Sequence, residues 1–149
     1  MKITYGAVLP LPLEEAFTFV ADPLNWPTFF PGVRAVDKDA DWGSVGGRAR
    51  LTTVVLRRSM TMYLELTEWD PPNAFRYSVS QDAGPGDDDN RRTFTPVLDG
   101  TRMTGTTDIP TRSGLHGVVD RLQLLIVRAV FAKAMSRLPA AAAEHRNVA

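Results

Sequence analysis

Apolar side chains change their spacing along the chain, and each change predicts a different element. Residues 3–8 alternate weakly, which predicts a first strand. Pro12, followed by two glutamates, is typical of the first turn of a helix, and the apolar positions within 16–20 give that helix a buried face. Residues 25–32 contain too much proline for a long helix. They predict a second, shorter helical segment that is packed down by its aromatic side chains.

The middle of the chain, from residue 33 to residue 109, has a period of two, which is typical of strands. The pattern is clearest over 59–69, where methionine and leucine alternate with polar residues. Asp70-Pro71-Pro72-Asn73 and Asp99-Gly100 are turn sequences, and strands joined by short turns pair antiparallel. The expected strands are 33–37, 48–56, 59–69, 75–79, 91–97 and 101–109.

The C-terminal part predicts one long helix, with Ser113 as its N-cap, that extends to Ala143 if Pro139 only kinks it. Its main apolar stripe is Leu115, Val118, Val119, Leu122, Leu125, Ile126 and Ala129. A second stripe, formed by Leu124, Phe131 and Met135, predicts either a homodimer contact or packing beneath residues 26–32. Only this helix is large enough to cover the apolar face of the sheet. Because a bent sheet rarely closes along the full length of a helix, we expect a gap that holds a ligand.

Composition narrows the possible functions. The 149 residues are expected to form a single domain, 1–149. Lys and Arg number 17, as do Asp and Glu, and this lack of a basic excess argues against a nucleic-acid partner. There is no cysteine and only two histidines, with no spacing that suggests a metal site. No segment has the apolar length of a signal peptide or a membrane span, so we expect a cytoplasmic protein with no membrane partner.

Several short segments together resemble the START-like, or helix-grip, superfamily, and most closely its polyketide cyclase/dehydrase branch. These segments are LPLPLEEAF at 9–17, VADP at 20–23, WPTFFPGV at 26–33, Gly46-Gly47, TEWDPPNAFRY at 67–77 and GTRMT at 100–104. The resemblance covers nearly the whole chain. It implies an α+β fold in which a curved antiparallel sheet of about seven strands surrounds a long C-terminal helix, with two short helices after the first strand. The superfamily includes aromatase/cyclases and carriers of hydrophobic ligands, so it does not fix the function.

His116 is a candidate catalytic residue because Asp120 lies four residues later, on the same helix face. A histidine oriented by an aspartate is a usable general acid or base near neutral pH. The alternative is a surface pair at the start of the helix.

Arg92 and Tyr77 are the other catalytic candidates. Arg92 has the same strand parity as Phe94, which predicts an inward side chain that could hold a carboxylate or stabilise an enolate. A shift of the strand by one residue would place Arg91 inside instead. The resemblance also implies an inward Arg92, because the matching strand faces the cavity in the aromatase/cyclases. Tyr77 lies on the apolar face, where its hydroxyl needs a partner, either a substrate or another protein group.

The remaining candidates are expected to line a ligand site. Trp26 and Phe30 match positions at the pocket mouth of the resembling cyclases, although they could instead anchor the short helices. Gly105 leaves room for a ligand on the wall that Thr107 shares. The other expected ligand-binding residues are Met62, Leu64, Phe75, Phe94, Met103, Leu115, Val119 and Leu122.

The leading hypothesis is an enzyme without a cofactor that binds a hydrophobic, polyketide-like molecule and promotes its cyclisation or dehydration. Arg92 would stabilise negative charge, and His116 and Tyr77 would transfer protons. The rival hypothesis is a carrier or sensor of a lipid or hydrophobic metabolite, with no chemistry. A third is an interaction module that uses the second stripe of the long helix.

Overall fold

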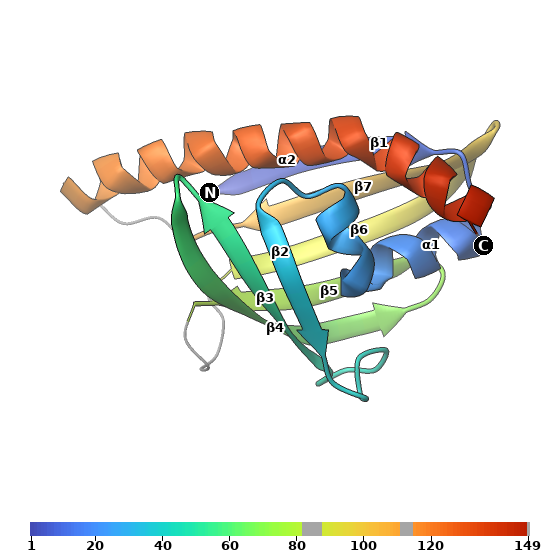
Figure 1. Cartoon of the computed structure of the whole chain (residues 1–149), viewed down its shortest axis with the longest axis horizontal. Helices are drawn as coiled ribbons and strands as arrows, with labels where there is room; N and C mark the ends of the chain where they lie inside the picture. The colour runs from blue at the N-terminus through green and yellow to red at the C-terminus, as the bar shows by residue number, and fades with distance from the viewer. Residues whose placement is uncertain (82–87, 111–114, 149) are drawn as a thin grey trace.

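The computed structural model describes residues 1–81, 88–110 and 115–148, without the side chains of 115–120, 123 and 148. The elements are β1 (Lys2–Leu9), α1 (Leu13–Ala21), the 3₁₀ helix η1 (Pro23–Thr28), β2 (Val33–Lys38), β3 (Arg48–Val55), β4 (Arg58–Asp70), β5 (Ala74–Ser80), β6 (Asp88–Val97), β7 (Gly100–Asp108) and α2 (Leu115–Val148). The strands form one antiparallel sheet in the order β1-β7-β6-β5-β4-β3-β2. The sheet curls beneath α2, and α1 lies near the C-terminal end of α2 (Figure 1). The expected helix-grip fold is confirmed.

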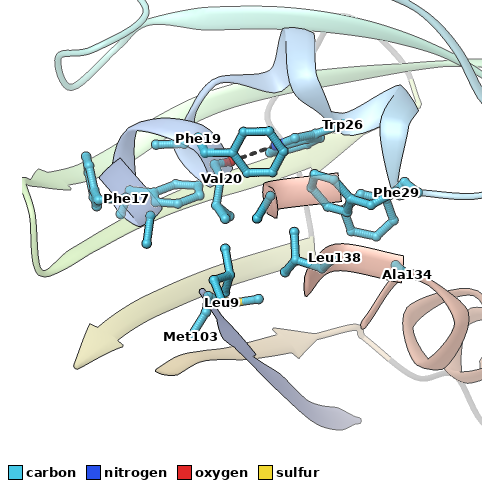
Figure 2. Close-up of a cluster of buried hydrophobic side chains, with 14 of the residues drawn as sticks. Leu9, Phe17, Phe19, Val20, Trp26, Phe29, Met103, Ala134 and Leu138 are labelled. Carbon is cyan, nitrogen blue, oxygen red and sulfur yellow. Dashed lines mark hydrogen bonds between the residues drawn. The ribbon is translucent and has the colours of Figure 1, made fainter. Parts of the chain in front are cut away.

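The two short helices are held together at the C-terminal end of α1. That end has no basic side chain to bind its last carbonyl groups. Two indole N–H groups serve instead: Trp26 donates to the carbonyl of Val20 at 2.7 Å, and Trp42 donates to that of Ala21 at 2.9 Å. The Trp26–Val20 bond is the dashed line in Figure 2. The Asp22 carboxylate accepts the N–H of Leu24 and caps η1. The position of Trp26 in the interior is thereby fixed by the backbone of α1.

The apolar face of α1 closes one end of the curved sheet. The ring of Phe17 meets those of Trp69, Phe75 and Phe94 edge to face, with centroids 5.2, 5.9 and 5.3 Å apart. A bulge just after Leu66 changes the parity of β4, so that Leu66 and Trp69 both face this core. Trp69 is therefore a packing residue near the end of β4.

α2 is rotated relative to the sequence-based prediction. Leu122 and Leu125, placed on the sheet-facing stripe, are 58% and 61% exposed, so that assignment is wrong for both. Leu124 is buried, and Phe131 packs against Tyr5 of β1 and Phe30. Further along the helix, the buried side chains are Ala134, Leu138, Ala141 and Ala142. The small alanines let the helix approach closely, which favours this rotation over one that buries the bulkier leucines. The second stripe therefore packs largely against β1, at Ile3 and Tyr5, and Phe131 also reaches Phe30, so packing beneath residues 26–32 holds only in part.

Two hairpins turn through two residues but differ in backbone strain. The β3–β4 turn consists of Leu56 and Arg57, and both have positive φ, 51° and 64°. That geometry suits a twisted hairpin, but favours Asn and Gly over branched or long side chains. In the β6–β7 turn, Leu98-Asp99, only Asp99 has a positive φ. The turn thus begins one residue before the Asp99-Gly100 pair that the sequence indicated.

Replacing both residues of the first turn, Leu56→Asn with Arg57→Gly, should relieve this strain. We expect the free energy of unfolding to rise by about 1 kcal/mol in a urea titration. The matched control is Leu98→Asn, which changes another exposed turn leucine, one without positive φ, and should alter stability by less than about 0.5 kcal/mol. An equal gain in both variants would mean that removing an exposed leucine, and not backbone strain, is responsible.

Candidate functional site

Two rows of paired residues cross β1, β7, β6 and β5 on the concave face of the sheet. In one row Tyr5 pairs with Gly105, Gly105 with Arg92, and Arg92 with Phe75. The next row contains Thr107, Asn90 and Tyr77, with Thr107 paired to Asn90 and Asn90 to Tyr77. Residues two apart on a strand share a face, so both rows project towards the interior. The side chain of Arg92 therefore points inward, and it is 1% exposed. Its neighbour Arg91 points outward and forms an ion pair with Glu68.

The guanidinium of Arg92 lies among aromatic rings. Its Nη2 donates to the Tyr77 hydroxyl at 2.8 Å, and its Nε lies 3.5 Å from the Tyr5 hydroxyl. The carbon of the guanidinium is 4.7 Å from the ring centre of Trp26 and 5.4 Å from that of Phe30. The third nitrogen, Nη1, is buried and has no hydrogen-bond partner among the described residues. Among the described residues, both groups that accept a hydrogen bond from Arg92 are tyrosine hydroxyls, and neither is a carboxylate.

This environment is costly for a cation. Burying a charge without a partner of opposite sign is strongly unfavourable. Cation–π contacts recover part of that cost, each about 1–2 kcal/mol where water is excluded. Arg92 is the only buried charged residue in the described part of the chain, whereas the ion pairs of Arg76 with Asp89 and Arg91 with Glu68 lie at the surface. A cation held this way is a ready partner for an oxygen that carries or develops negative charge.

Protonation at the site follows from burial. Burial raises the pKa of the Tyr77 hydroxyl above its usual value, and the nearby charge of Arg92 only partly opposes this rise. Burial acts against the charge of Arg92, while the Tyr77 and Tyr5 oxygens favour it, and the pKa of the guanidinium ends above its ordinary value. Tyr77 therefore stays protonated near neutral pH and Arg92 stays charged. Because the Tyr77 oxygen already accepts from Arg92, its own O–H remains able to donate.

Two residues of this cluster, Tyr5 and Asn90, were not predicted from the sequence. Thr107 donates to the Asn90 side-chain oxygen at 2.7 Å and lies 3.5 Å from the Tyr5 hydroxyl. Tyr5 reaches Arg92 by crossing over Gly105, where an added Cβ would lie 2.1 Å from the tyrosine ring. The expectation that Gly105 leaves room for a ligand is therefore wrong, because Tyr5 fills that room. A tyrosine paired with a glycine on the neighbouring strand is the signal that could have revealed it, once the strand pairing is known.

Two hollows stand out over the described residues, and the larger one does lie between the sheet and the long helix, but at the β1 edge and not over Arg92. One hollow, of about 460 Å³, lies between β1 and α2, and another, of about 210 Å³, lies near Pro10 and Arg146. Arg92 lines neither hollow. Trp26, Phe30 and Phe131 occupy the interior instead, with Phe30 in contact with both other rings. A ligand can reach Arg92 only if some of these side chains move.

The other predicted ligand-binding residues fall into three groups. Leu64, Phe75, Phe94, Met103 and Thr107 are buried, and Met62 is half-buried against the same core. Phe94 packs against Phe17 of α1, so it lies at the α1 end of the core. Leu122 is exposed and does not line the interior. The side chains of His116, Asp120, Leu115 and Val119 lie outside the described residues.

Neither a metal site nor a membrane span is evident in the described structure. No three His, Asp or Glu side chains gather there in a group that could hold a metal ion. No helix among the same residues is both long and apolar enough to cross a bilayer.

Replacing Arg92 tests whether its side chain stabilises the fold. We expect Arg92→Met to leave the free energy of unfolding unchanged or to raise it by up to about 2 kcal/mol, because an apolar side chain of similar length suits these surroundings better. Phe75→Ala, in the same row, is the positive control. Its free energy of unfolding should fall by about 3–5 kcal/mol, which would show that the urea titration detects damage to the core. A loss of several kcal/mol in Arg92→Met would mean that the cation holds the fold together.

Comparison with known proteins agrees with this architecture. The chain superposes on TTHA0849 from Thermus thermophilus with a TM-score of 0.78 at 18% identity, covering 97% of this chain and 99% of that one. CV1439 from Chromobacterium violaceum gives 0.71 at 19% identity, covering 94% and 96%. The di-domain ARO/CYC StfQ of the steffimycin biosynthetic pathway gives 0.71 at 18% identity, covering 99% of this chain and 52% of that one. No curated protein matches the sequence. Residues 1–143 match the family described as polyketide cyclase / dehydrase and lipid transport, and the chain belongs to that family.

Proposed function

We propose that the protein is a cofactor-independent enzyme that binds a hydrophobic, polyketide-like molecule beside Arg92 and promotes its cyclisation and dehydration. The observation that carries the proposal is the free Nη1 of Arg92, a charged donor in an apolar interior of the described chain. Family membership supports a substrate of this class, and the ARO/CYC protein StfQ has the same fold.

The chemistry begins with a ketone whose oxygen lies against Arg92. When a base removes a proton from the adjacent carbon, the electron pair of that C–H bond forms a carbon–carbon double bond, and the π pair of the carbonyl moves to the oxygen, which gives an enolate. Nη1 of Arg92 and the O–H of Tyr77 would both donate to this oxygen. The enolate carbon then bonds to a second carbonyl carbon, and the new alkoxide takes up a proton. Loss of that hydroxyl with a neighbouring hydrogen, as water, gives the double bond.

Aromatic side chains would position the substrate for this reaction. Trp26 and Phe30 face the guanidinium, and flat rings of this kind can hold a conjugated chain in a folded conformation. Fixing the two reacting carbons close together supplies much of the rate enhancement in an intramolecular condensation. In this scheme His116, paired with Asp120, is the proposed base, because Tyr77 stays protonated.

A second candidate function is transport of a hydrophobic anion without chemistry. It is favoured by the described neighbours of Arg92, since Tyr77, Tyr5, Thr107 and Asn90 include no carboxylate and no imidazole that could act as the base. The family description also includes lipid transport. A carrier would bind the anion at Arg92 but would not assist its formation from a neutral precursor.

Titration of a bound β-diketone tests the enzyme proposal. Benzoylacetone forms an enolate with its own ultraviolet absorption, so the pH of half-ionisation can be read in free and bound ligand. We expect the protein to lower this pH by about one to two pH units, because a hydrogen bond to a charged group contributes about 1.5–3 kcal/mol. Arg92→Met should abolish the change, and Tyr77→Phe should reduce it.

Arg91→Met is the matched control, because Arg91 precedes Arg92 on β6 and points outward. Benzoylacetone bound to this variant should ionise at the same pH as benzoylacetone bound to the unmodified protein. Binding of neutral benzoylacetone with no change in its ionisation would favour the carrier. A change that persists in Arg92→Met would refute the role of Arg92 in either function.

A further inference from the structure

The larger hollow is a groove between the outer edge of β1 and the side of α2, on the far side of Tyr5 from Arg92. Its volume of about 460 Å³ is within the range of sites that hold a small organic molecule. Its lining residues are Lys2, Ile3, Thr4, Tyr5, Gly6, Arg128, Phe131, Ala132 and Met135. β1 is an edge strand, so one side of its backbone is not paired within the sheet.

The charges of the groove have one sign. Lys2 on β1 and Arg128 on α2 line it from opposite sides, and its described lining contains no acidic residue. Asp108, which is opposite Lys2 in the sheet register, contacts the N-terminal ammonium group. The rest of the lining is largely apolar, with Phe131 and Met135 on the helix side. An occupant that complements this lining has a flat apolar body and an acidic group.

Two stacked rings separate the groove from the Arg92 cluster. Tyr5 and Phe131 lie with ring centroids 4.4 Å apart and planes 18° apart, and both line the groove. On the other side, Phe131 meets Phe30 at 5.6 Å and the Tyr5 hydroxyl lies 3.5 Å from Nε of Arg92. The Tyr5 hydroxyl also lies 3.5 Å from Oγ1 of Thr107. Hydrogen bonds of this length are weak, so little energy holds the Tyr5 hydroxyl in place.

We propose that this groove is an outer binding site for an amphipathic anion, an aromatic or otherwise hydrophobic carboxylate, and that displacement of the Tyr5–Phe131 pair lets the anion pass on to Arg92. Lys2 and Arg128 attract the acidic group, and Arg92 receives it. The destination at Arg92 rests on the function proposed above, whereas the binding of an anion in the groove does not.

Rapid-mixing fluorescence with two dyes tests the proposal. Anilinonaphthalene sulfonate is an anion, and N-phenyl-1-naphthylamine is the same ring system without the sulfonate. We expect the anionic dye to bind in a fast phase, in the groove, followed by a slow phase as it reaches Arg92. In Lys2→Gln with Arg128→Gln, the association rate of the anionic dye should fall about three- to tenfold at low salt, with little change for the neutral dye. Lys133→Gln, on the exposed face of α2, is the charge-matched control and should leave both rates unchanged.

Variants of the stacked pair test the passage. Phe131→Leu should increase the rate of the slow phase several-fold, and Phe131→Ala should increase it further if that variant folds. Arg92→Met should remove the slow phase and leave the fast one.

The outcomes separate the two proposals. One outcome is loss of the slow phase in Arg92→Met, with rates unaffected by the Lys2, Arg128 and Phe131 changes. It would contradict binding of the anion in the groove and would still support binding at Arg92. The opposite outcome is a fast phase that depends on Lys2 and Arg128, with no effect of Arg92→Met on either phase. It would support binding in the groove and contradict passage of the anion to Arg92. If Lys2→Gln with Arg128→Gln slows the association of both dyes equally, the two cations do not act by attracting the acidic group.

Discussion

The burial of one guanidinium in a mostly apolar interior is the constraint that shapes the centre of this structure. Arg92 is fully enclosed, and its described partners are hydroxyl groups and ring faces, not a carboxylate. Each of these contacts is worth little compared with the cost of burying the charge. Tyr77, Tyr5 and Trp26 therefore have to converge on one point from three different elements.

That convergence depends on the pairing of the strands. Tyr5 can lie across β7 only because the residue opposite it is Gly105, and Gly105 in turn is opposite Arg92. Trp26 approaches from the other side, where its N–H is bound to the last turn of α1. The side chain that terminates α1 thus also lies against the buried cation, with its ring centre 4.7 Å from the guanidinium carbon of Arg92. Loss of strand register or of the α1 end would disturb the same site.

Features that depend on neighbouring residues could be predicted from the sequence, whereas features that depend on tertiary contacts could not. The strands, the short helices and the inward direction of Arg92 could be predicted, because parity and turn residues act within a few positions of the chain. The rotation of α2 could not, because two apolar stripes compete and the choice depends on contacts such as Phe131 with Tyr5. Tyr5 was missed for the same reason, since its importance comes from pairing with Gly105, a residue far away in the sequence.

Trp26 gives this arrangement an optical consequence. Its indole ring lies 4.7 Å from the centre of the guanidinium, in an interior where charges are poorly screened. The emission of an indole responds to the electric field across its ring, and an anion seated on Arg92 would cancel much of that field. Trp42 and Trp69 have no such contact with Arg92 among the described interactions. An anion bound beside Arg92 would therefore change the protein's own fluorescence, and no label would be needed to detect it.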